Sequence, residues 1–263
     1  MLTFVYPADY FKPHQVDPDY LPEAEAALQN GFSVSTWDGQ SLRPAPAPGT
    51  RLMYRGWMLT GAQYTQLYGL WASQGYMLKT SPEDYQLCHY MHRWYHSLQS
   101  YTPETHFIEA GSDALEVAQE TLKAVLANGE WEAAFVKDAV KSLKTAGGSR
   151  LTDETDLQRW FKAMQQFRQE VEWPICLRRW HPWQSESERR YFVYQGEVLA
   201  PAALLPVPTL VNEVAERIDS PFFSVDIILD EHDRWQLVEI GDGQVSGLTE
   251  AWQPEDFMAQ LAR

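Results

Sequence analysis

A long apolar hairpin near the C-terminus constrains the fold of this chain more than any other feature. Residues 222–240 have the pattern of two strands joined by a four-residue turn. If Asp230 pairs with Trp235 across that turn, the same register places Asp226 opposite Glu239. Directly opposed side chains in a sheet have Cβ atoms about 4.5–5.5 Å apart, and like charges at that spacing destabilise the pairing. The hairpin therefore predicts that something offsets the repulsion between two acids.

Several arrangements would offset this repulsion. The rest of the hairpin is mostly apolar, so both faces of the sheet are expected to be buried and water alone would screen the acids poorly. A bound divalent cation is the simplest answer, and ligands that are all oxygen favour Mg²⁺ over zinc. A proton shared by the carboxylates, or a nearby Arg or Lys, would also serve. A one-residue bulge would instead turn the acids to opposite faces. The residues alone leave all of these open.

The charge balance narrows the classes of partner. The 263 residues include 36 Asp plus Glu against 21 Lys plus Arg, and the formal net charge is −15. Such a surface repels phosphodiester backbones and anionic lipid, which disfavours nucleic acid as the main partner. No stretch reaches the length of a membrane span, and the first residues lack the basic and apolar regions of a signal peptide. We therefore expect a cytoplasmic protein without a membrane segment.

The cysteines and histidines do not predict a metal site. Cys88 and Cys176 lie far apart and form no CxxC motif, which argues against a disulfide framework and a thiolate zinc site. His89, His92 and His96 share one helix face, but no HExxH motif or carboxylate accompanies them. A histidine-rich aromatic helix more often packs and forms hydrogen bonds than binds a metal ion.

Local patterns divide the chain into two parts. Residues 1–105 alternate short apolar strands with helical patterns, which is typical of a small α/β domain. Residues 106–263 begin with helices and continue mostly as strands. The predicted helices are 22–30, 62–73, 82–99, 112–128, 152–171 and 210–218, and the predicted strands outside the hairpin include 51–57, 133–137, 175–180, 190–194 and 197–200.

Lys137 is a candidate phosphate ligand. It ends the apolar strand 133–137 and precedes the loop 138–150, which holds Lys141, Lys144 and two glycines. A lysine there can contact phosphate oxygens while the loop closes over them as a mobile lid, although the GxxxxGK[ST] motif of a P-loop is absent. Taken alone, Lys137 is more often a solvated strand end.

Arg190 is a second candidate. Period-two alternation places Glu188 and Arg190 on one face of a strand and Arg189 on the other. One guanidinium would then point into any cleft that the sheet lines. The competing interpretation, a ladder of salt bridges on the surface, is favoured while this strand is considered by itself.

Taken in order, these features resemble the ATP-grasp superfamily. The order is a strand ending in Lys137, a Gly/Lys loop, an amphipathic helix, the strand 175–180, the strand of Arg190, and the pair Asp226 and Glu239. The resemblance spans roughly residues 76–250, and the first domain fits the domain that precedes the ATP-grasp domain in that family. The branch most similar to this chain is RimK-like, with bacterial and phage relatives.

The resemblance implies an α/β (α+β) chain in which an ATP-grasp domain, 106–263, follows a small domain, 1–105. It implies ATP and Mg²⁺ as cofactors, and a carboxylate–amine ligase that acts through an acyl phosphate on small-molecule or peptide substrates. A homodimer is compatible with it. A kinase on the same fold and a nucleotide-binding protein without turnover are the alternatives.

The resemblance also assigns roles to residues. Lys137 matches the family lysine that contacts the ATP phosphates, and Lys144 is expected to assist in binding the nucleotide. Arg190 matches the arginine that faces the transferred phosphate or acyl group, and Lys141 is assigned to catalysis beside it. The two Mg²⁺ carboxylates would be Asp226 and Glu239, and the hinge whose backbone reads adenine would be Leu177, Arg178, Arg179 and Trp180.

Two positions depart from the family pattern. The family usually has Asn two residues after the second carboxylate, whereas this chain has Gly241, so Asp242 would have to supply the missing oxygen. The hinge commonly carries an acid that meets the ribose, and Arg178 and Arg179 occupy that stretch. The earlier phosphate lysine of the family has no clear match, and Lys79 is the only candidate.

Overall fold

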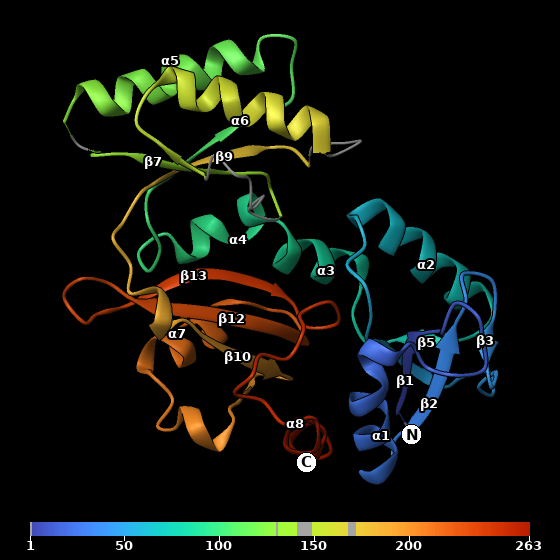
Figure 1. Cartoon of the computed structure of the whole chain (residues 1–263). Helices are drawn as coiled ribbons and strands as arrows, with labels where there is room; N and C mark the ends of the chain where they lie inside the picture. The colour runs from blue at the N-terminus through green and yellow to red at the C-terminus, as the bar shows by residue number, and fades with distance from the viewer. Residues whose placement is uncertain (1, 130, 141–148, 168–171) are drawn as a thin grey trace. The chain divides into compact units, whose positions relative to one another are not determined.

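Three β-sheets organise residues 2–129, 131–140, 149–167 and 172–263, the part of the chain that this computed structural model describes. Contacts group the chain into two units (Figure 1). The first consists of Met1–His89, Glu188–Ile227 and Leu237–Arg263, and the second of Tyr90–Ser187 and Ile228–Gln236. The chain therefore enters and leaves the second unit twice.

The first sheet of the first unit is mainly parallel and has the order β3-β2-β1-β4-β5. Parallel neighbours require long crossovers, and helices α1 and α2 provide them. Gly31, with φ +81°, follows α1, and a capping box between Thr60 and Gln63 begins α2, so both predicted helices are confirmed. The bounds are β1 Leu2–Pro7, α1 Leu21–Gln29, β2 Ser33–Trp37, β3 Leu42–Arg43, β4 Arg51–Tyr54, α2 Gly61–Ser73, β5 Met77–Leu78 and α3 Pro82–His89, with a 3₁₀ turn at Pro18–Tyr20.

The second sheet, β11-β10-β12-β13, packs on the first sheet within the same unit. One apolar core joins the rings of Phe4 and Tyr6 from β1 to Phe192 and Phe222 from the second sheet. Helix α8, which the sequence patterns did not predict, adds Phe257 and packs against α1. The bounds are β10 Arg189–Tyr194, β11 Glu197–Leu199, α7 Thr209–Arg217, β12 Phe222–Leu229, β13 Trp235–Asp242 and α8 Pro254–Leu261, with a 3₁₀ turn at Ala202–Leu204.

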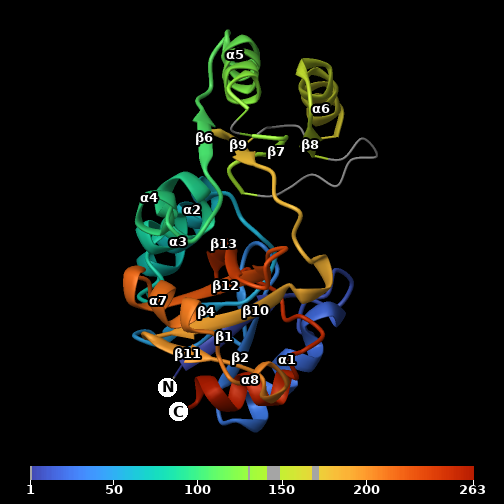
Figure 2. The ribbon, with the colours of Figure 1, turned by 90° about the vertical axis from the view of Figure 1, so that its left-hand side faces the viewer.

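The second unit has an antiparallel sheet in the order β6-β9-β7-β8. Helices α5 and α6 cover one side of it, and α4 lies on the other side (Figures 1 and 2). The core under α5 and α6 includes Trp160, whereas the ring of Tyr95 on α4 contacts Phe107 on β6. The bounds are α4 Met91–Leu98, β6 Thr105–Ile108, α5 Ala114–Ala127, β7 Ala134–Lys137, β8 Arg150–Leu151, α6 Glu154–Phe167 and β9 Ile175–Arg179, with a 3₁₀ turn at Ser185–Ser187.

The helix predicted at 82–99 is wrong as one element, because α3 and α4 are separated at Tyr90. Tyr90 has extended backbone angles, φ −105° and ψ 120°, and the following Met91 N–H donates to Ala139 O at 3.0 Å. The break coincides with the passage of the chain from the first unit to the second. The predicted domain boundary between residues 105 and 106 lies within β6.

The hairpin β12–β13 is confirmed, but its turn differs from the prediction. Asp230 N–H donates to Arg234 O at 2.9 Å, so Asp230 does not pair with Trp235. Asp233, with φ +59°, gives the turn the extra left-handed residue typical of a three-residue loop closed by a bulge.

Further from the turn, the strands keep the register that the sequence predicts. Gly243 N–H donates to Phe222 O at 3.1 Å. The two ends of the hairpin therefore differ in register by one residue, so β13 contains a bulge. Burial alternates regularly except between Leu237 and Ile240, both of which are buried. The bulge therefore lies at Val238 and Glu239.

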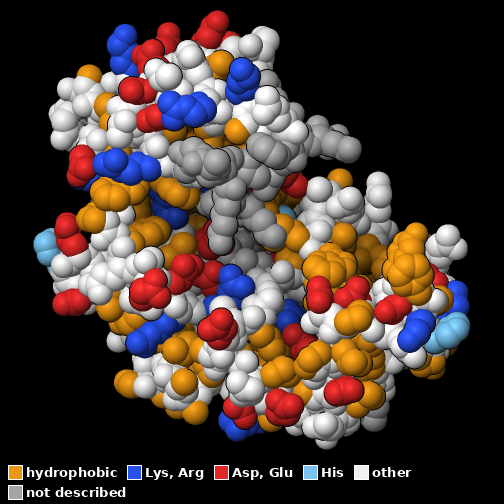
Figure 3. All heavy atoms as spheres, viewed as in Figure 1, with side chains coloured by type: hydrophobic (Ala, Val, Ile, Leu, Met, Phe, Trp, Pro, Cys, Tyr) orange, Lys and Arg blue, Asp and Glu red, His pale blue; other side chains and the backbone are white. Residues whose placement is uncertain are grey.

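No helix among the described residues is long and apolar enough to cross a membrane. On the face in Figure 3, acidic side chains are spread among apolar ones rather than gathered in a single patch.

Candidate active site

Adjacent strands β10 and β12 bring Arg190 and Asp226 together. The two residues are directly opposed in the sheet. Arg190 Nε donates to Asp226 Oδ1 at 2.7 Å, and Nη2 donates to Oδ2 at 2.5 Å. Asp226 is only 4% exposed, and both of its oxygens accept from one planar guanidinium. An arginine is therefore what stabilises this acid in the structure, one of the explanations that the sequence left open.

Arg190 is fixed at two further points. Its Nη1 donates to Gly247 O at 3.0 Å, and its own backbone oxygen accepts from Trp252 Nε1 at 3.0 Å. Burial by itself would lower the pKa of Arg190, but the bonds to Asp226 and the negative charges of Glu239 and Glu188 raise that pKa above its usual value. Glu239 thus acts electrostatically on the same guanidinium as Asp226. This part of the sheet is a cation between carboxylates and not a surface ladder.

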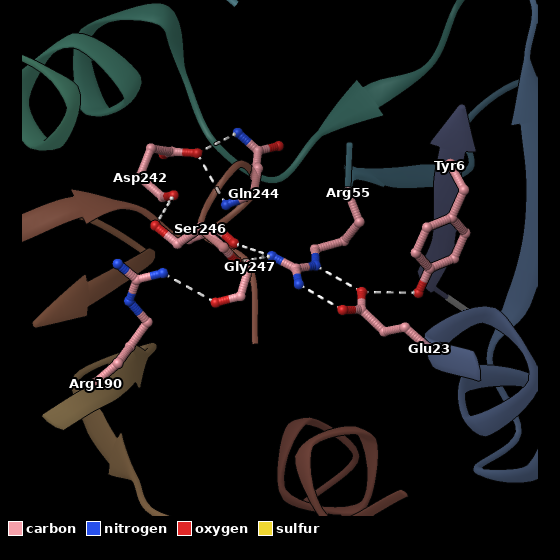
Figure 4. A network of polar contacts seen from close by, with 9 residues as sticks. Tyr6, Glu23, Arg55, Arg190, Asp242, Gln244, Ser246 and Gly247 are labelled. Carbon is pink, nitrogen blue, oxygen red and sulfur yellow. Dashed lines mark hydrogen bonds and ion pairs between the residues drawn. The ribbon is translucent and has the colours of Figure 1, made fainter. Parts of the chain in front are cut away.

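Asp242 ends β13 in a fully buried position. Its Oδ1 accepts from the backbone N–H of Gln244 at 3.0 Å and from Nε2 of the same side chain at 3.1 Å (Figure 4). Its Oδ2 has no hydrogen-bond partner among the residues that the structure describes. Burial raises the pKa of Asp242 to about 8, so the protonated form is favoured near neutral pH. A cation would reverse that preference.

Gly241 stands where the family usually has Asn, and the structure has no room for a side chain there. A Cβ on Gly241 would lie 2.9 Å from Ser246 Oγ and 3.0 Å from Ser224 Oγ. The two hydroxyl oxygens are 2.8 Å apart. Sequence reasoning missed both serines, because Ser224 becomes a neighbour of Gly241 only through the register of the hairpin.

Sequence reasoning also missed a buried arginine beside this loop. Arg55 follows β4 and forms a two-bonded ion pair with Glu23 on α1 (Figure 4). The Arg55 Nη1 atom donates to the carbonyls of Gly243 and Ser246. The only signal in the sequence is a charged residue directly after a buried strand, which does not reveal its partners.

In the second unit, Lys137 is buried and not a solvated strand end. It is the last residue of β7, lies opposite Cys176 in β9, and is 2% exposed. A lysine buried to this extent requires polar or charged partners, because an ammonium group loses hydration on burial. The burial removes the main objection to a binding role for this residue.

The hinge stretch forms the end of β9, the strand between β6 and β7. Arg178 is buried, donates from Nη2 to Thr102 Oγ1 at 2.5 Å, and lies over the ring of Trp183. The N–H groups of Arg179 and Trp180 donate to the carbonyls of Glu104 and Ala133. Leu177 is buried in the core of the sheet. Adenine would therefore have to be read by other backbone atoms of this stretch or of the residues that follow it.

The remaining candidates divide as follows. Lys141 and Lys144 lie outside the described residues, together with most of the predicted lid. Lys79 lies in the first unit just after β5, with its ammonium 5.3 Å from the centre of the Tyr194 ring. His89 stacks on Tyr85 with ring centres 4.8 Å apart, in line with a packing role. The candidates Arg190, Asp226, Glu239 and Asp242 belong to the first unit, and Lys137 and residues 177–180 to the second.

The carboxylates fit Mg²⁺ only together with another source of oxygen. Within the described ranges, no group of three or more His, Cys, Asp or Glu side chains is arranged to hold a metal ion. Mg²⁺ commonly takes one or two carboxylates and completes its shell with water and substrate phosphates. Asp226 and Glu239 can supply those carboxylates, and the orphan oxygen of Asp242 lies buried at the end of the same strand.

The fold and these residues define an ATP-grasp protein. The model of one ATP-grasp domain family, the third family of its clade, matches residues 73–261. The chain belongs to this family. Comparison with curated protein sequences gives no match.

Solved structures support the fold over the whole chain. A D-cycloserine synthetase superposes with a TM-score of 0.62 at 15% identity, covering 100% of this chain and 99% of the other. A RimK-domain ATP-grasp protein from Sphaerobacter thermophilus gives 0.62 at 12% identity, covering 100% and 98%. The D-alanine–D-alanine ligase from Coxiella burnetii gives 0.64 at 9% identity, covering 100% and 95%. At these identities the similarity shows the fold alone.

Proposed function

We propose that this protein is an ATP-dependent ligase that joins a carboxylate to an amine. The observation that carries the proposal is the Arg190–Asp226 pair, directly opposed on β10 and β12, with Glu239 acting on the same guanidinium. Phosphoryl transfer needs charge neutralisation and positioning more than covalent help from the protein. A buried cation among carboxylates that can bind Mg²⁺ suits that requirement.

The proposed reaction has two steps. An oxygen of the substrate carboxylate attacks the γ-phosphorus of ATP, and the bond from phosphorus to the bridging oxygen breaks to give ADP and an acyl phosphate. The amine nitrogen then attacks the acyl carbon, the carbon–oxygen bond to phosphate breaks, and the nitrogen loses a proton. An amine that arrives neutral requires no strong general base.

The residues take the following roles in this proposal. Asp226 and Glu239 hold Mg²⁺, which when bound offsets the charge of the ATP phosphates. Arg190 exchanges the oxygens of Asp226 for those of the transferred phosphate, since both are planar or trigonal anions that accept from its fork. Lys137 contacts the phosphates, and the stretch 177–180 contacts adenine.

The substrate class is proposed from the structural neighbours. Two of them are named for making D-cycloserine and D-alanyl-D-alanine, and a macrocyclase from Microcystis aeruginosa is described as bound with its precursor peptide. We therefore propose amino acids or peptides as the acid and the amine, in a reaction that takes place in the cytoplasm.

A screen for ADP release with Mg²⁺ against amino acids and peptides, with mass analysis of products, tests the proposal. ADP, phosphate and an amide in equal amounts would support it. A stable phosphate ester would indicate the kinase alternative, and ATP binding without ADP release would indicate the non-catalytic one. Asp226→Asn should abolish release. Asp38→Asn, which changes an acid of a surface turn, should retain it.

A further inference from the structure

Arg55 is a buried arginine that the reaction proposed above does not use. It is 2% exposed, and its Nε and Nη2 donate to the two oxygens of Glu23 at 2.7 and 2.5 Å. Tyr6 OH donates to the same carboxylate at 3.2 Å. Burial alone would lower the pKa of Arg55, but Glu23 raises it above its usual value, so the pair is ionised.

Stability is a weak reason for such a pair. Removing two charges from water costs free energy that their attraction often does no more than return, and apolar replacements of similar size are frequently as stable. The cost has to be set against what else the arginine contacts. Its third nitrogen, Nη1, does not bond to Glu23 at all.

That nitrogen holds the loop 243–247, which follows β13. Arg55 Nη1 donates to Gly243 O and to Ser246 O, the second at 2.8 Å. The residue after Arg55, Gly56, donates its N–H to Gln244 O at 3.1 Å. Carbonyl groups in an irregular loop need donors from elsewhere, and here they come from the end of β4.

The same loop supports the arginine of the candidate site. The carbonyl of Gly247, next in sequence to that of Ser246, accepts from Arg190 Nη1 at 3.0 Å (Figure 4). Two arginines therefore bind adjacent peptide carbonyls, one from the N-terminal sheet and one from β10. If Arg55 releases Ser246, the peptide that holds Arg190 loses its support.

We infer that Arg55 is a positioning residue, which fixes the loop 243–247 so that Gly247 orients Arg190 for phosphoryl transfer. The inference rests on the function proposed above for the role of Arg190. Its structural part, the support of the loop by Arg55, is independent of that function.

The first test is amide hydrogen exchange of residues 241–248 without nucleotide. Arg55→Met alone would leave Glu23 buried and unpaired and could prevent folding, so it is combined with Glu23→Met, which removes both charges. We expect a folded protein whose loop amides exchange about tenfold faster or more, because the loop opens locally. The matched control is Arg234→Met, which breaks another Arg–Asp pair, with Asp230, and should leave exchange of this loop unchanged. Wild-type exchange in the folded double variant would overturn the inference.

The second test separates positioning from a general loss of structure. In the ADP-release assay the double variant should lose about 10- to 100-fold in kcat, the cost of a misplaced catalytic group, with KM for ATP within about twofold. Adding Arg190→Lys to it should cost no more than Arg190→Lys alone, because both changes act through one guanidinium. Fully additive losses, or a rise in KM alone, would contradict the inference.

The two tests fail in distinguishable ways. If the wild-type protein releases no ADP with any substrate, the proposed function falls, and the exchange result still decides whether Arg55 supports the loop. If the wild type is active and Arg55→Lys restores neither slow exchange nor kcat, a fork that reaches both Glu23 and the loop is required, as the inference states.

Discussion

At the scale of single residues, a lysine and a glycine decide how the candidate site can work. Lys137 is buried where a strand-end lysine would ordinarily be solvated. Gly241 leaves space that two serine hydroxyls fill. Neither fact is local in the sequence, because each depends on which strands are neighbours.

Replacing Lys137 with Met should weaken ATP binding by about 1.5–3 kcal/mol, the range for a hydrogen bond to a charged group. Calorimetric titration with a non-hydrolysable ATP analogue measures this. Lys123→Met, which changes an exposed lysine on α5, should alter affinity by less than about 0.5 kcal/mol. Equal affinity of the wild type and the Lys137 variant would remove this lysine from the proposed site.

Introducing the usual family residue with Gly241→Asn should destabilise the protein by about 1–3 kcal/mol, because the side chain has to displace Ser224 and Ser246. Urea unfolding measures the loss. Gly247→Asn is the matched control, since a Cβ there would meet no atom within 4 Å, and it should cost much less. Similar losses from the two variants would show that the serine pair does not restrict this position.

The limits of sequence reasoning at this scale are physical. The cross-strand partners in the hairpin follow from counting, so Asp226 and Glu239 could be placed as neighbours. Arg190 could be placed on a strand but not opposite Asp226, because β10 and β12 are separated by α7 and β11. Arg55 is separated from Ser246 by most of the chain, and no periodicity reports a contact of that kind.

At the scale of elements, the β12–β13 turn depends on one acid. Asp230 accepts from the N–H groups of His232 and Arg234, and from Arg234 Nε at 2.9 Å. Although burial opposes ionisation, these bonds lower the pKa of Asp230 to about 2. The turn is thus closed by a carboxylate that has to stay charged.

Because the folded pKa of Asp230 is below its unfolded value of about 4, its contribution to stability is fully present above that value. It is lost as pH falls through about 2. The difference in free energy of unfolding between wild type and Asp230→Asn should therefore be about 1–3 kcal/mol at pH 6 and shrink toward zero near pH 2. Urea titrations across this range measure it. Glu231→Gln, an exposed acid in the same turn, should show no comparable trend, and a constant difference for Asp230→Asn would count against the assignment.

Most helices and strands were predictable because their periodicity and end signals are local. The patterns for α1, α2, α5, α7, β7, β9 and the hairpin lie within two residues of the observed bounds. The break between α3 and α4 was not predictable, because apolar periodicity continues through Tyr90 while the two halves pack in different units. The bulge at Val238 and Glu239 was also hidden, since alternation in an apolar strand does not reveal one extra residue.

At the scale of the whole molecule, the division into units does not follow a single cut in the sequence. The first unit combines an N-terminal segment with two later ones, and one core joins Phe4 on β1 to Phe192 on β10 and Phe257 on α8. The second unit has its own core around Trp160. Segments that share a core should gain and lose protection together, whatever their distance in sequence.

Native-state hydrogen exchange tests this division. Phe192→Leu should destabilise the first unit by about 1–1.5 kcal/mol, because it removes ring contacts with Phe222 and Phe257. Protection should then fall in β1 and β4, far away in sequence, while the amides of α5 keep their wild-type exchange. Trp160→Phe should produce the reverse pattern. A uniform loss of protection in both units from either variant would show that the protein opens as one cooperative body, and that the cores do not define separate units of stability.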